Sequence, residues 1–142
     1  MTDTKPTQDD RIMAALAHAC AILFGMGTVG AIVIWATQKD KSEYVAFQAL
    51  QAIVYQIAGL VATMIGWCCW MALYFASFIP LIAAAEQGGD PPFIFWFSML
   101  LMFAPLAVMG LWILGGLWGA VRCLGGHDFK YLVVGNWLEK QG

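Results

Sequence analysis

The sequence predicts an all-α integral membrane protein, and three observations carry this prediction. Hydrophobic residues make up 61% of the 142 residues and charged residues only 11%, whereas soluble domains carry about 25% charged residues. The mean hydropathy is +0.73. The run from Tyr44 to Ala85 contains no Asp, Glu, Lys or Arg, and as a helix it would be roughly 60 Å long, twice the hydrocarbon thickness of a bilayer. We expect a single helical membrane domain over residues 1–142.

The first helical segment is expected over residues 9–24, after a helix-start signal at Thr7–Asp10. Glycines between Gly25 and Gly30 interrupt it, and a second arm is expected over residues 29–37. The break allows either one kinked crossing or a re-entrant hairpin, and the hairpin is slightly favoured. The glycine spacing also matches a dinucleotide-binding pattern, but that motif follows a strand, and here apolar helices stand on both sides.

Two long antiparallel transmembrane helices are expected next, over residues 43–85 and 93–124. Ser42 is placed to cap the first of them, and Gly125-Gly126 is placed to end the second. The tail from residue 127 onwards mixes aromatic and charged residues, which predicts a short interfacial segment.

The distribution of Lys and Arg predicts the orientation. The turn at residues 39–43 and the tail after Arg122 carry them, whereas the 86–92 loop has none. The positive-inside rule then places the turn and the C-terminus in the cytoplasm and the 86–92 loop outside.

Composition and motif spacing argue against most chemical functions. The net charge of −2 predicts no nucleic-acid partner, and no cluster of Lys or Arg marks a lipid-headgroup site. The two histidines, His18 and His127, are far apart, so we expect no metal and no cofactor. Every acidic residue lies outside the apolar runs, and no nucleophile has an adjacent base, so we expect no enzyme.

Two groups of residues are candidate interaction sites. The first is a set of polar side chains near the predicted cytoplasmic side: His18, Gln48, Gln51, Tyr55 and Gln56. Hydrogen bonding between helices is favoured for it about two to one over a lining where a peptide, lipid or partner docks. The second is a face of small residues in the last helix: Gly115, Gly116, Gly119 and Ala120. Packing within the chain is slightly favoured for it over dimerisation.

The order of several motifs resembles a known family. A His in the first apolar helix and a glycine break precede Ile34-Trp35 and the Lys39–Ser42 turn. The segment Val45–Ala52 then leads a long helix, and Gly119-Ala120 and Tyr131–Gly135 follow late in the chain. This pattern resembles the Tic-like family, small bacterial membrane proteins related to the import channel of the chloroplast inner envelope. That family usually has His where this chain has Gln48. The resemblance implies three or four membrane helices and a link to protein translocation. The acidic N-terminus does not look like that of an organelle precursor, so within this resemblance a bacterial inner membrane is expected rather than a plastid.

Together these features predict a non-enzymatic membrane subunit whose partners are the lipid bilayer and other membrane proteins or itself. An oligomeric channel or carrier for a small solute is the alternative, and a structural accessory subunit is a third possibility. The sequence is equally compatible with the subunit that binds other membrane proteins and with the structural accessory subunit.

Overall fold

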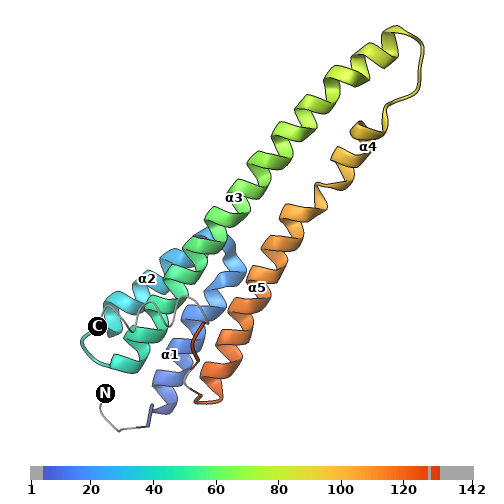
Figure 1. Ribbon diagram of the computed structural model, residues 1–142. Coiled ribbons are helices and arrows are strands. Elements are labelled where there is room, and N and C mark those ends of the chain that lie inside the picture. The colour runs from blue at the N-terminus through green and yellow to red at the C-terminus, as the bar shows by residue number, and fades with distance from the viewer. Residues whose placement is uncertain (1–4, 128, 132–142) are drawn as a thin grey trace. The chain divides into compact units, whose positions relative to one another are not determined.

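The computed structural model describes residues 5–127 and 129–131, and throughout this part of the chain every regular element is helical (Figure 1). Three helical stretches are long and apolar enough to cross a membrane: Gln8–Gln38, Glu43–Glu86 and Phe93–Leu124. The chain divides into two compact units. Unit 1 comprises Met1–Leu60 and Leu111–Gly142, and unit 2 comprises Val61–Gly110.

The first stretch is α1 (Gln8–Ala19), the 3₁₀ helix η1 (Cys20–Met26) and α2 (Gly27–Gln38). Thr7 caps α1 as expected, because its hydroxyl accepts from the Asp10 N–H at 3.2 Å while the Asp10 carboxylate accepts from the Thr7 N–H at 2.9 Å. The helical path breaks at Phe24, where φ is +40° and ψ is −162°. A side chain other than glycine rarely adopts this conformation, so the bend is locally strained.

After the bend, α2 packs back against α1. Ala17 of α1 and Ala31 of α2 share one buried cluster with Ala49, Ala52 and Ile53 of α3. At the other end of the pair, the Asp10 side chain interacts with Ser42, in the turn after α2. The start of α1 and the end of α2 therefore lie together, and Figure 1 shows α1 and α2 as the two arms of a bent pair.

The longest helix, α3 (Glu43–Glu86), contributes to both units. Ser42 caps it as expected, accepting from the Val45 N–H at 3.4 Å. It ends where Gly88, with φ of +66°, allows the Gly89 and Gly88 N–H groups to bond the carbonyls of Ala84 and Ala85. This is the double hydrogen bond of a Schellman motif, which satisfies carbonyls that have no partner inside the helix.

The expected single helix over residues 93–124 is instead two helices, α4 (Phe93–Leu100) and α5 (Phe103–Leu124), separated by a turn at Leu101 and Met102. Pro105 gives the physical reason, because it has no N–H to donate to the Leu101 carbonyl and its ring crowds that carbonyl. Gly126, with φ of +71°, ends α5, and His127 N–H bonds the Arg122 carbonyl. The predicted stop at Gly125-Gly126 is confirmed.

In unit 1, small side chains allow the helices to approach closely. Its buried apolar residues are mostly alanines, and Ala14 and Ala15 of α1 pack against Ala120 and Cys123 of α5. Such contacts favour close backbone packing, which stabilises helix pairs where no water is available to drive association.

Candidate functional site: a buried polar cluster

One stripe of α3 carries the polar residues that the sequence singles out. Gln48, Gln51 and Tyr55 recur at steps of three and four, so they lie on one helical face. Gln48 is 1% exposed and Gln51 is 0% exposed. Buried amides must find hydrogen-bond partners to offset their desolvation, so the partners of these two side chains define the site.

Those partners are the main chain of the C-terminal segment. The Gln48 and Gln51 amide nitrogens both donate to the Phe129 carbonyl, at 3.0 and 3.3 Å, and the Tyr131 N–H donates to Gln51 Oε1 at 3.2 Å. A primary amide has one carbonyl acceptor and N–H donors, like a peptide group. The Gln51 side chain therefore bonds both the carbonyl of Phe129 and the N–H of Tyr131, as the main chain of a neighbouring β-strand would. Residues 129–131 are thus held against α3, whereas the sequence predicts an interfacial segment; residues 132–142 lie outside the described part.

His18 joins the glutamines to the tail side chains. Its Nε2 lies 3.1 Å from Gln48 Oε1, and its Nδ1 lies 3.1 Å from the Tyr131 hydroxyl. Because Gln48 donates through its nitrogen to Phe129, its oxygen is the acceptor, so His18 Nε2 carries the proton and Nδ1 accepts from Tyr131. A neutral ring therefore satisfies both contacts. The Cys123 thiol also donates to Gln48 Oε1, at 3.6 Å.

Aromatic contacts surround this network. The Tyr55 and Tyr131 rings stack with centroids 4.0 Å apart and an interplanar angle of 5°, and Phe129 meets the His18 ring edge-on. Burial raises the pKa of the Tyr131 hydroxyl, which therefore remains a neutral donor to His18. Tyr55 and Trp112 exchange hydrogen bonds with each other's main-chain carbonyls at 2.9 and 2.8 Å.

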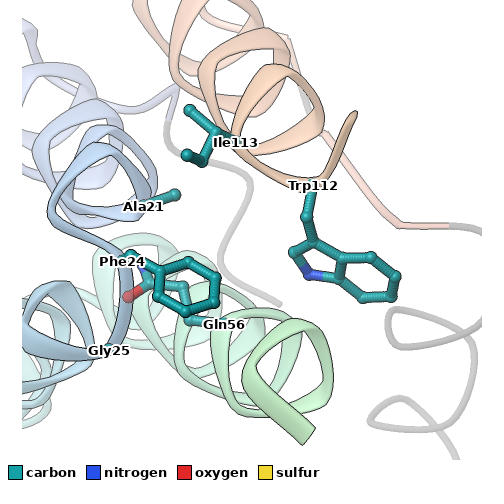
Figure 2. Close-up of a pocket in the computed structure, with 6 residues that line it drawn as sticks. All are labelled: Ala21, Phe24, Gly25, Gln56, Trp112 and Ile113. Carbon is teal, nitrogen blue, oxygen red and sulfur yellow. The ribbon is translucent and has the colours of Figure 1, made fainter. Parts of the chain in front are cut away.

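Gln56 is not part of this network, and its hydrogen bond is made near the break between α1 and α2. Its amide nitrogen donates to the Ala17 carbonyl at 3.0 Å, at the end of α1. Figure 2 shows Gln56 from α3 beside a small cavity, which is also lined by Phe24 and Gly25 from η1 and by Trp112 from α5. The cavity has a volume of about 10 Å³, which is enough for one water molecule at most.

The small-residue face of α5 is used inside unit 1. Gly115 lies against the Tyr55 hydroxyl, and Gly116 lies against Ala21 and the His18 carbonyl. A Cβ at Gly119 would lie 2.9 to 3.1 Å from Phe129, the Tyr131 hydroxyl and His18 Nδ1. A side chain at position 119 would therefore crowd the contact between the tail and the histidine.

The structure brings His18, Gln48, Gln51 and Tyr55 together and leaves Gln56 at the hairpin. It adds residues that the sequence does not single out for the site, which are Phe129, Tyr131, Trp112 and Cys123. The alternation of aromatic residues at 129 and 131 is the one local signal that could have indicated an inserted tail. Over residues 5–127 and 129–131, no group of three or more His, Cys, Asp or Glu is placed to hold a metal ion.

The chain matches one family model, described as the magnetosome magnetite crystal formation protein family, over residues 9–138. No curated protein and no solved structure matches it. The resemblance to the Tic-like family is therefore wrong, and protein translocation, which rested on that resemblance, loses its support.

Proposed function

Because the chain belongs to the magnetosome magnetite crystal formation family (MamF/MmsF), we propose that it is a non-enzymatic protein of the magnetosome membrane that acts in crystal formation through the proteins it assembles with. The observation that carries this proposal is the extent of the match. Residues 9–138 include the whole buried polar cluster and all three apolar helical stretches apart from Gln8.

The surfaces of the helices support a membrane location. In the most apolar window of α3 only 6% of the residues are buried inside the protein. Large apolar side chains on this helix, such as Ile65, Phe75 and Ile79, are more than half exposed. Lipid is the solvent that such side chains require, because water would penalise so much apolar surface.

The packing of α1 against α2 favours the hairpin over the kinked single crossing. In the proposed topology α1 and α2 enter and leave on the cytoplasmic face, α3 crosses the membrane, and α5 returns. The strained backbone at Phe24 then lies at membrane depth, where it is tolerated because Gln56 and neighbouring helices cover it. The loop at residues 87–92 lies on the other side.

The buried cluster favours a subunit role over a solute channel. Its amides and imidazole bond to each other and to residues 129–131, and the nearby cavity holds one water molecule at most. A solute route needs polar groups that face an open passage. The cluster instead stabilises one arrangement of α1, α3, α5 and the tail, which leaves the lipid-facing helix surfaces for association with other membrane proteins or a second copy.

The test is deletion of the gene in a magnetite-forming bacterium that carries it, with complementation by a tagged full-length copy. We expect the tagged protein in purified magnetosome membranes and a change in crystal size or number, measured by electron microscopy, that the copy reverses. Crystals that are unchanged by the deletion, with the tagged protein absent from the magnetosome fraction, would contradict the proposal.

The topology has a separate test in a variant whose native cysteines are replaced by alanine. Lys41→Cys and Asp90→Cys, both at exposed positions, should react with an impermeant maleimide from opposite sides of the membrane. Labelling of both from the same side would contradict the proposed crossings while leaving the membrane location intact.

A further inference from the structure

A hollow in unit 1 lies between the start of α1 and the end of α5, at the polar ends of the first and third apolar stretches. It has a volume of about 430 Å³ and is lined by Pro6, Gln8, Arg11, Ile12 and Leu124. The lining comes from both ends of the sequence, so no run of basic residues marks it in the chain.

Arg11 is the charged group of this hollow, and its guanidinium has an unfilled bonding capacity. Arg11 Nε has no hydrogen-bond partner among the described residues but is buried, so the terminal Nη groups of the guanidinium are the donors that an anion in the hollow would meet. The group lies directly over Gly126, where a Cβ would come within 2.6 Å of Arg11 Cζ. The nearest carboxylate in sequence that could compete, that of Asp10, is engaged by Thr7 at 2.7 and 2.9 Å.

The apolar part of the lining points to the class of ligand. Ile12 is 40% exposed and Leu124 is 54% exposed, and both line the same hollow as Arg11. Ile12 begins the uncharged run of the first stretch, and Leu124 is the last residue of the third. A ligand that fits has an anionic group for the guanidinium and hydrocarbon for the membrane side.

We propose that this hollow binds the phosphate group of an anionic phospholipid, with Arg11 as the anion-binding residue and Ile12 and Leu124 against the acyl chains. A guanidinium matches phosphate oxygens with paired N–H donors, and basic pockets between membrane helices bind lipid headgroups in this way. The site is independent of any role in mineral formation.

The experiment measures lipid binding to the purified full-length protein in detergent, by native mass spectrometry and by the shift in unfolding temperature. The probes are phosphatidylglycerol, phosphatidylcholine and inorganic phosphate. Phosphatidylglycerol should bind more tightly than phosphatidylcholine, and Arg11→Gln should weaken it about fivefold. Arg122→Gln is the matched control, because Arg122 is an exposed arginine at the end of α5, two residues before Leu124, but does not line the hollow. This variant should change the affinity less than twofold.

Ile12→Asn provides a second variant at a partly exposed position, in case Arg11→Gln fails to fold. It should weaken phosphatidylglycerol binding without altering the charge of the site. Equal effects of Arg11→Gln and Arg122→Gln, or Ile12→Asn without effect, would overturn the proposal. Stabilisation by inorganic phosphate equal to that by the lipid would overturn its assignment to a phospholipid.

Discussion

The two compact units of this chain differ in the side chains that they bury between their helices. Among the described residues, every buried apolar side chain except that of Pro105 lies in unit 1, from Ala14 to Ile53 and at Ala120 and Cys123. The buried non-glycine residues of unit 2 are Thr63, Ser77, Ser98 and Pro105. Unit 1 has an interior of its own, whereas in unit 2 the apolar side chains other than that of Pro105 are exposed or only half-buried.

This difference shows what a polar network contributes in lipid. In unit 1, hydrogen bonds from His18, Gln48 and Gln51 join segments far apart in sequence, so they specify a tertiary arrangement. In unit 2, the Ser77 and Ser98 hydroxyls lie 3.1 Å apart and Trp70 donates to the Ser98 carbonyl at 2.8 Å. These contacts join neighbouring helices that the short 87–92 loop already connects, so they contribute less to specifying the tertiary arrangement.

The largest effect is expected for Gln48→Leu in unit 1. The substitution leaves the His18 Nε2–H without its acceptor, removes the Gln48 oxygen that the Cys123 thiol contacts, and removes one donor from the Phe129 carbonyl. It should lower the free energy of unfolding by about 2–3 kcal/mol, measured by denaturation in mixed micelles. Gln87→Leu, at an exposed position, is the control and should change it little. Equal stability of the two variants would contradict the role of the network.

A glycine pair compares the units directly. Gly119→Ala places a Cβ about 3 Å from Phe129, Tyr131 and His18, whereas a Cβ at Gly110 of unit 2 meets nothing within 4 Å. We expect Gly119→Ala to destabilise the protein by about 1–3 kcal/mol and Gly110→Ala to leave it unchanged or raise stability by up to ~1 kcal/mol. The same denaturation measurement decides, and the reverse order would show that the α5 face is not packed as described.

At the bend, position 24 should favour glycine over alanine, which is the reverse of their usual order in helices. Phe24→Ala and Phe24→Gly both remove the ring, but only glycine adopts a φ of +40° without strain. The glycine variant should therefore be the more stable of the two by about 1 kcal/mol, compared by thermal unfolding in one detergent. If alanine is the more stable by its ordinary helical advantage, residue 24 lies in a continuous helix and the hairpin is not formed.

The smallest effect is expected in unit 2. Ser98→Ala removes the hydroxyl contact with Ser77 but keeps the Ser98 carbonyl that Trp70 bonds. Interhelical hydrogen bonds in membranes average about 0.6 kcal/mol, so stability should fall by about that amount in the same assay. A loss as large as that of Gln48→Leu would remove the contrast between the units.

The sequence predicts the helices well because their signals are local. The uncharged run after Glu43, the Ser42 cap and the Gly126 stop each depend on neighbouring residues alone. The division at Leu101 and Met102 has a local cause in Pro105, so it could have been predicted. The tail contacts could not, because the periodicity of α3 shows that Gln48 and Gln51 share a face but not which distant segment covers it.

The measurement that tests the account most directly is a double-mutant cycle on His18 and Tyr131, whose side chains meet at 3.1 Å. Unfolding free energies of His18→Leu, Tyr131→Phe and the double variant give the coupling between a residue of α1 and a residue of the tail. The account predicts a coupling of about 0.6–1.7 kcal/mol. Additivity of the two substitutions to within about 0.3 kcal/mol would show that the tail does not occupy the buried cluster.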